Sequence, residues 1–287
     1  MPQTILVMGV RGKTGRQLAA TLLQHRGVRV RGVGRNTTGL NIPNLTLGHF
    51  DWEDPSSWSE ATADIDSIYL IKPKTADPAA TVASFLQRVR NLKRLVLLSE
   101  IDAANRDESA DERRVETVIE TSPHTWTILR PNWFMQNFSE PSFYLEAIRD
   151  AGELRVPTKG QRTSFVDTRD IADVAAAALL ESGHERCFYT LTGPQALTWN
   201  DVVADIGRAA GHQIRCIDPC LDEYLSALSK KGTAEKTIAY YRRIYGAIRE
   251  GRTAVVSPDV ENVTGRPPRM FSAFVSENKS LWSRKHP

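Results

Sequence analysis

Three glycines near the start of the chain, Gly9, Gly12 and Gly15, have the spacing of a phosphate-binding turn. A short apolar run at 5–8 precedes them, and residues 16–25 then carry apolar side chains at helical spacing. In such a turn one glycine permits the reversal, one lets the backbone approach a pyrophosphate, and one lets the helix lie close to the strand. The helix N-terminus also offers N–H groups and a partial positive charge. The pattern predicts a dinucleotide site, with an ordinary glycine turn as the alternative.

Two basic residues, Arg11 and Lys13, lie within the same turn. Gly12, Lys13 and Thr14 also match the end of the loop that binds nucleoside triphosphates, but that loop needs a further glycine where Val7 stands. Val7 belongs to the predicted strand. We therefore expect Arg11 and Lys13 to lie beside the pyrophosphate of a dinucleotide.

Arg35 follows the second predicted strand, at 28–33, where the adenosine ribose lies in a dinucleotide site. NAD sites place an acidic side chain there to bind the ribose 2′-hydroxyl. No Asp or Glu lies nearby in the chain, and a guanidinium holds a 2′-phosphate that a carboxylate would repel. We infer NADP(H) rather than NAD(H) as the cofactor. The alternative is that Arg35 is a solvated loop charge.

Apolar runs alternate with helical patterns over the first half of the chain. Strands are expected at 5–8, 28–33, 45–49, 66–71, 94–98 and 125–129, and helices at 16–25, 78–90 and 110–121. This alternation predicts an α/β fold with a doubly wound parallel sheet of the Rossmann type. Ligands bind beyond the carboxyl ends of such strands, so the glycine turn should share a crevice with Lys72, Pro73, Ser99 and 132–137. We assign Lys72, Pro73 and Asn132 to the nicotinamide end of the cofactor.

The strict alternation ends at Phe138, and mixed helix and loop patterns follow. We therefore expect a dinucleotide-binding domain at 1–138 and, at 139–287, mostly a smaller C-terminal lobe that completes the substrate pocket. An edge strand near 187–192 should return to the first domain. Three aromatic residues either line the substrate pocket or pack the two lobes together: Trp133, Phe134 and Phe138.

Bulk composition excludes several classes of protein. The chain has 287 residues, 41% of them hydrophobic and 25% charged, which is enough to bury a large core. Its net charge of +3 is spread out, so nucleic-acid binding is not expected. No signal peptide or membrane span is recognisable, and the cytoplasm is the expected location. The three cysteines are expected to be reduced thiols without a metal, and the sequence does not indicate an oligomeric state.

Several segments together resemble the NmrA-like atypical short-chain dehydrogenases. Besides the glycine turn and Arg35, they are TILRPNWFMQN at 127–137, FVDTRDIAD at 165–173, LTGP at 191–194 and VTGRPPR at 263–269. The run IYLIKP at 68–73 also resembles the branch that contains the ergot-alkaloid dehydrogenases. The resemblance implies a Rossmann domain that holds NADP(H) and a small C-terminal lobe. It implies one of three functions: reduction of imines or iminium ions, reduction of quinones or enones, or NADP(H) sensing without chemistry.

One departure from the wider family affects the mechanism. Short-chain dehydrogenases usually carry a Tyr and, one helical turn later, a Lys on the helix after strand five; the lysine lowers the pKa of the tyrosine, which protonates a carbonyl oxygen. When the helix is aligned on Glu116, Glu108 and Glu112 stand in those two places, so the dyad is absent. The remaining candidate catalytic residues are Ser99, Glu100 and Asp102.

A C=N acceptor is compatible with a missing acid. Hydride addition to an iminium ion yields a neutral amine, whereas addition to a ketone creates an alkoxide that must be protonated or stabilised. We therefore expect an NADPH-dependent reductase of a small metabolite with a C=N bond.

Overall fold

The computed structural model describes residues 2–89, 92–141 and 143–283. The chain forms two compact units, each built from several stretches of sequence. The first unit consists of Met1–Pro131, Thr168–Leu191 and Asp259–Arg266. The second unit consists of Asn132–Asp167, Thr192–Pro258 and Pro267–Pro287.

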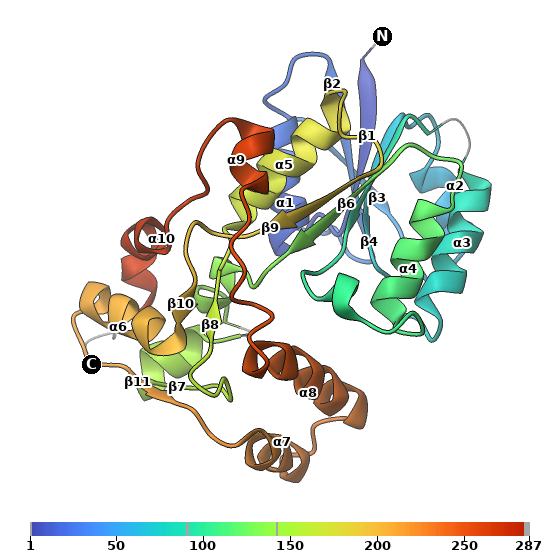
Figure 1. The fold of residues 1–287 in the computed structure, drawn as a ribbon. Coiled ribbons are helices and arrows are strands. Elements are labelled where there is room, and N and C mark those ends of the chain that lie inside the picture. Colours follow the sequence, from blue (N-terminus) through green and yellow to red (C-terminus); the bar gives the residue numbers. More distant parts are fainter. Residues whose placement is uncertain (1, 90–91, 142, 284–287) are drawn as a thin grey trace. The chain divides into compact units, whose positions relative to one another are not determined.

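A seven-stranded parallel sheet forms the centre of the first unit, in the order β3-β2-β1-β4-β5-β6-β9 (Figure 1). Its strands are β1 (Gln3–Met8), β2 (Val28–Gly34), β3 (Leu45–His49), β4 (Ser67–Ile71), β5 (Arg94–Leu98), β6 (Trp126–Pro131) and β9 (Cys187–Leu191). The order runs outward from β1 in one direction to β3 and from β4 in the other to β9, so the topological switch point lies between β1 and β4. Ligands bind at the carboxyl ends of the strands at such a point.

Helices cover both faces of this sheet, which confirms the expected doubly wound α/β fold (Figure 1). On one face α1 packs against α5, and on the other α3 packs against α4. The helices of the unit are α1 (Lys13–Leu22), α2 (Ser56–Ala61), α3 (Pro78–Arg88), η1 (Ala103–Asn105), α4 (Asp111–Glu120), α5 (Thr168–Leu180) and α9 (Asp259–Thr264). Apolar side chains at helical spacing explain this arrangement, since each helix buries one stripe against the sheet.

The division into units differs from the boundary expected near Phe138. The first stretch of the first unit ends at Pro131, and two later stretches of the chain, which contain α5, β9 and α9, also belong to this unit. Ten of the thirteen residues of α5 are buried, which is why this alanine-rich helix belongs to the sheet and not to the smaller lobe. Strand β9 lies at the edge of the sheet, where a returning strand was expected.

The second unit is a mixture of short strands and helices around its own core. Its elements are η2 (Met135–Phe138), η3 (Ala147–Ala151), β7 (Glu153–Arg155), β8 (Arg162–Thr163), β10 (Leu197–Thr198), α6 (Trp199–Ala210), β11 (Arg215–Ile217), α7 (Leu221–Lys230), α8 (Glu235–Arg249), α10 (Phe271–Asn278) and η4 (Lys279–Leu281). Two small sheets pair β10 with β8 and β11 with β7. Phe138, Phe165 and Trp199 are fully or almost fully buried and pack edge-to-face or tilted, which gives this unit an aromatic core.

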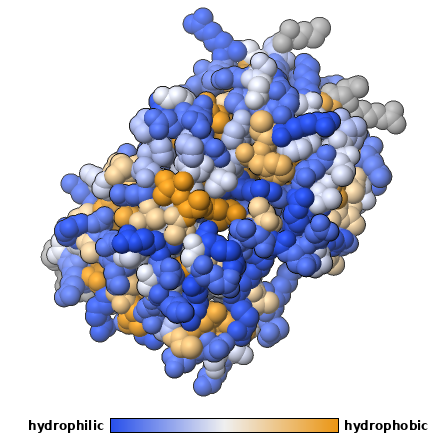
Figure 2. Space-filling model, in the orientation of Figure 1, coloured by the Kyte–Doolittle hydropathy of each residue, from blue (hydrophilic) through white to orange (hydrophobic). Residues whose placement is uncertain are grey.

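The molecular face in Figure 2 is mainly hydrophilic, with apolar residues in small groups. Among the described residues, no helix combines the length and the apolar character that a membrane crossing requires.

Candidate active site

The strand, turn and helix that the glycine spacing predicts are present between β1 and α1. Gly9 has a φ of 63°, a backbone conformation that favours glycine. The N–H of Gly12 donates to the carbonyl oxygen of Gly9 across 2.7 Å and so closes the turn. A Cβ on Gly15 would lie 2.4 Å from the same oxygen, so glycine is needed for the close approach of α1 to β1.

Gly12 is the N-cap residue of α1 and is exposed. No side chain caps the helix, and its first turn contains no acidic residue. The first N–H groups of α1 and the positive end of its dipole are therefore not neutralised by a carboxylate from that turn. A side chain at Gly12 would cover this helix end. These features fit the pyrophosphate of a dinucleotide.

The carboxyl end of β2 carries positive charge. Arg35 is exposed there, and Arg11 donates from Nη1 to the carbonyl oxygen of Thr38 across 2.5 Å, which holds a second guanidinium beside the same loop. No ion pair joins Arg11 or Arg35 to a carboxylate among the described residues. The first acidic residue of the whole chain is Asp51, and the residues before it include seven Lys and Arg. This part of the first unit is suited to an anionic ligand.

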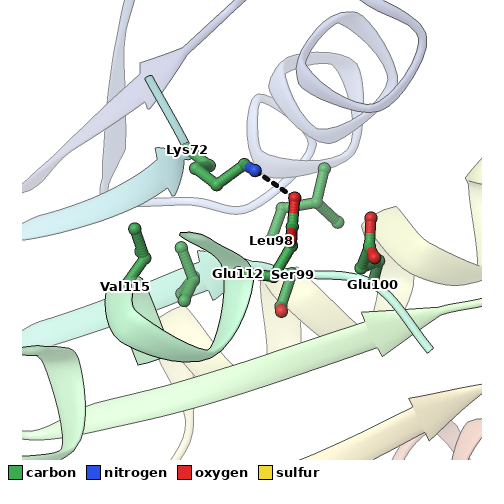
Figure 3. Close-up of a pocket in the computed structure, with 7 residues that line it drawn as sticks. Lys72, Leu98, Ser99, Glu100, Glu112 and Val115 are labelled. Atoms are coloured by element: carbon green, nitrogen blue, oxygen red, sulfur yellow. Dashed lines mark hydrogen bonds and ion pairs between the residues drawn. The ribbon is translucent and has the colours of Figure 1, made fainter. Parts of the chain in front are cut away.

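The end of β4 adjoins the glycine turn, because the Cδ1 atom of Ile71 lies 2.7 Å from the place where a Cβ on Gly9 would be. The next residue, Lys72, lines a small pocket of about 60 Å³, and Pro73 is buried behind it. Lys72 Nζ forms an ion pair with Glu112 Oε1, drawn as a dashed line in Figure 3. The pocket is lined by Lys72, Leu97, Leu98, Ser99, Glu100, Glu112 and Val115.

Ser99 lies at the end of β5 and donates its hydroxyl hydrogen to Glu116 Oε1 across 2.6 Å. Glu116 is fully buried in α4, and Arg130 binds both of its oxygens at 3.0 and 2.7 Å. Arg113 lies 3.2 Å from the same carboxylate. A buried carboxylate is tolerated when it is paired and hydrogen-bonded in this way. The hydroxyl of Ser99 therefore serves an internal network and has no hydrogen left for a substrate in this arrangement.

Glu100 and Asp102, the other two candidate acids, share one guanidinium. Arg106 Nη2 lies 3.2 Å from Glu100 Oε1 and 3.2 Å from Asp102 Oδ2. The side chain of Glu100 is 30% exposed, that of Asp102 is 8% exposed and that of Arg106 is 12% exposed. Glu100, which shares this guanidinium with Asp102, is also part of the pocket lining.

An ion pair also fixes the position of α4. Asp77 caps α3 by accepting from the N–H of Ala80 at 3.0 Å, and Arg114 of α4 donates to it at 2.9 Å. The hydrogen bond from Arg114, followed by that from Ala80, holds the pKa of Asp77 below its ordinary value. The helix that supplies Glu112 and the helix that follows Lys72 are thus held to each other.

A family model described as NAD(P)H-binding matches residues 9–182, well over half of the chain. This range contains the glycine turn, Arg35 and the pocket. The chain belongs to the NmrA-like, NAD(P)H-binding family of atypical short-chain dehydrogenases.

Relatives of this NmrA-like chain match over nearly their whole length. The NAD(P)H azoreductase of Xenophilus azovorans is 30% identical, with 97% of this chain and 99% of that protein covered. Prestalk A differentiation protein A of Dictyostelium discoideum is 30% identical, with 96% of this chain and 93% of that protein covered. The agroclavine dehydrogenase of Claviceps fusiformis is 28% identical, with 97% of this chain and 98% of that protein covered.

The fold is shared with a solved structure. The triphenylmethane reductase of Citrobacter sp. in complex with NADP(H) has a TM-score of 0.79 and 19% identity to this chain, and 96% of this chain and 99% of that chain are covered. At this level of identity the likeness concerns the fold.

In this NmrA-like chain, α4 begins at Asp111, so only one of the two dyad positions lies on the helix. Glu108 precedes the helix and is exposed, and it also lies outside the helix expected at 110–121. Glu112 stands on the first turn of α4 and faces Lys72. The charges are therefore reversed relative to the usual arrangement: the helix supplies a carboxylate, and the lysine comes from the end of β4.

The remaining predicted site residues belong to the second unit. Asn132 is 2% exposed, and its amide donates to Ser164 Oγ at 2.7 Å and to the carbonyl oxygen of Thr253 at 2.8 Å. Its side-chain oxygen accepts from the N–H of Trp133 at 2.9 Å. A direct contact with nicotinamide would have to replace one of these bonds, so the assigned cofactor role of the Asn132 side chain is not supported by its surroundings.

The three aromatic candidates differ in exposure. Phe138 has no exposed surface and packs against Phe165 and Trp199, so it is a core residue of the second unit and not a pocket residue. Trp133 and Phe134 are half-buried and keep surface that a ligand can contact.

Four charged residues at or beside the pocket were not predicted from the sequence as parts of the site: Glu112, Glu116, Arg106 and Arg130. Glu116 served only to align the helix and Glu112 was placed at a dyad position without a role, although their spacing of one turn places them on the same face of α4. That spacing was the available signal. Arg130 gave no local signal, because it lies 14 positions from Glu116. Arg106 lies only four positions after Asp102, and that spacing was a signal.

Proposed function

We propose that this protein is an NADPH-dependent reductase of small metabolites with a C=N bond, either an imine or an iminium ion. Its relatives include an NAD(P)H azoreductase and an agroclavine dehydrogenase, so reductase chemistry at nitrogen-containing substrates is a consistent expectation.

The cofactor is assigned to the glycine turn and the end of β2. Gly9, Gly12 and Gly15, with Arg11 and Lys13, hold the pyrophosphate at the N-terminus of α1. Arg35 holds the 2′-phosphate, for which the absence of acidic residues before Asp51 is favourable. Lys72 and Pro73 stand at the nicotinamide end. When bound, the reduced nicotinamide supplies a hydride.

The acceptor is inferred chiefly from the hydrogen bond between Ser99 and Glu116. This bond uses the hydroxyl hydrogen of Ser99. A carbonyl reductase needs a hydrogen-bond donor at this position to stabilise the developing alkoxide. With Glu108 and Glu112 in the places of the dyad tyrosine and lysine, the usual acid is missing as well. An iminium ion needs neither group, because hydride addition to it yields a neutral amine.

A binding protein that senses NADP(H) is the second candidate, because the missing dyad is equally compatible with no chemistry. Incubation with NADPH and a panel of cyclic imines, iminium salts, quinones, enones and aldehydes separates the two, with absorbance of the reduced cofactor as the readout. We expect oxidation of NADPH with the C=N compounds. Tight binding of NADPH without turnover of any acceptor would favour the sensor, and turnover of quinones alone would favour the quinone reductases of the family.

A further inference from the structure

The ion pair of Lys72 and Glu112 determines the net charge of the pocket lining. Lys72 is 30% exposed and Glu112 is 10% exposed, so the ammonium is the more accessible of the two charges. Both groups line the pocket beside Ser99 and Glu100 (Figure 3). Glu112 is the carboxylate that compensates Lys72, and no other carboxylate lies within ion-pair distance of Lys72 Nζ among the residues that the structure describes.

An uncompensated ammonium at this position would change which ligands the pocket accepts. A unit charge within several ångströms shifts the preference for a charged over a neutral form by about one to three powers of ten. The same ammonium would stabilise an oxyanion formed from a carbonyl acceptor. Thus the carboxylate of Glu112 favours cationic acceptors in two ways: it cancels repulsion, and it engages the group that would otherwise assist carbonyl chemistry.

We propose that Glu112 is a specificity-determining residue, which makes the pocket accept a cationic C=N substrate by neutralising Lys72. The inference rests on the proposed function, since it explains the choice of acceptor and not the use of NADPH. It assigns a role to the helix position where the wider family carries its catalytic lysine.

The test compares a cation with a neutral ligand of the same shape. Titration calorimetry in the presence of NADP⁺ measures the affinity for a protonated cyclic amine and for the corresponding cyclic ether. In Glu112→Gln the affinity for the amine should fall about 10- to 100-fold, with little change for the ether. Lys72→Met should bind the amine at least as tightly as the wild type. The double variant Lys72→Met/Glu112→Gln should recover most of the lost affinity.

Charge compensation predicts opposite effects of Glu112→Gln and Lys72→Met on the affinity for the amine. A purely structural role of the ion pair predicts that both variants lose affinity. Glu108→Gln and Lys74→Met are matched controls, because both residues are exposed and lie close by in the chain. Equal losses for amine and ether in Glu112→Gln, or no loss for either, would overturn the inference. If the wild type reduces an N-methyl iminium salt while Glu112→Gln keeps the same preference, only this inference fails. A wild type that neither binds the amine nor reduces the salt contradicts the proposed function as well.

Discussion

Ser99 donates its hydroxyl hydrogen to the fully buried carboxylate of Glu116 across 2.6 Å. This bond links the end of β5 to α4 and makes the serine part of a charge network with Arg130. Its hydrogen-bonding capacity as a donor is therefore used inside the protein. The consequence for function is that Ser99 should matter more for stability than for turnover.

Replacing Ser99 with alanine tests this consequence. Turnover of an iminium salt should change by far less than the roughly 10²- to 10⁴-fold that loss of a catalytic acid causes. The free energy of unfolding should fall by about 1 to 3 kcal/mol, because Glu116 loses a buried donor. Steady-state kinetics and urea denaturation measure the two quantities, and Ser84→Ala on the exposed side of α3 is the control. A large loss of turnover in a protein of unchanged stability would make Ser99 catalytic.

Gly12→Val should abolish binding of NADPH and leave the fold intact. The N-cap backbone of Gly12, with φ of −73° and ψ of 168°, is open to any residue, and a Cβ there would come within 3.1 Å of the Gly9 carbonyl oxygen. Gly15→Ala is the contrasting variant, since its Cβ would lie 2.4 Å from the same atom and should destabilise the turn itself. Calorimetry with NADPH and thermal unfolding separate the two effects. Undiminished affinity in folded Gly12→Val would place the dinucleotide elsewhere.

Removal of Arg35 should weaken NADPH and spare NADH. A hydrogen-bonded charge pair with the 2′-phosphate is worth about 1.5 to 3 kcal/mol, which corresponds to about 10- to 100-fold in affinity. Arg35→Ala is compared by calorimetry with Arg29→Ala, because Arg29 is an exposed arginine of β2, the strand that Arg35 follows. A wild type that binds NADH as tightly as NADPH would show that Arg35 has no such role.

Acid should weaken the first unit partly through Asp66. Lys93 and, second, the N–H of Thr4 hold the pKa of this carboxyl below its ordinary value of 3.8. A carboxyl with a lowered folded-state pKa stabilises the fold above its unfolded pKa, and this contribution is lost as the pH falls through the folded value. Asp66→Asn should therefore lose about 1 kcal/mol near neutral pH and show a flatter decline of stability below pH about 4. Urea denaturation as a function of pH measures this. Parallel curves for variant and wild type would exclude the role.

Local patterns in the sequence were sufficient to predict the sheet and the glycine turn between β1 and α1. Apolar runs such as 5–8 predict buried parallel strands, and glycine spacing reports a backbone requirement that no other residue meets. The pocket was harder to predict, because Lys72 and Glu112 are 40 positions apart and come together only through tertiary contacts: the pairing of β4 with β5 and the packing of α3 against α4. Burial was also hard to predict: the sequence left open whether Phe138 lines the pocket or packs the lobes together, and the structure buries it in the core of the second unit.

The most direct measurement of the central claim is the ratio of kcat/KM for a cyclic iminium salt to that for the carbon-matched cyclic ketone, at saturating NADPH. We predict a ratio well above one, because hydride addition to the iminium ion needs no proton donor and Ser99 does not supply one. We also predict that the ratio persists in Ser99→Ala. Faster turnover of the ketone, together with a large loss of ketone reduction in Ser99→Ala, would contradict the account.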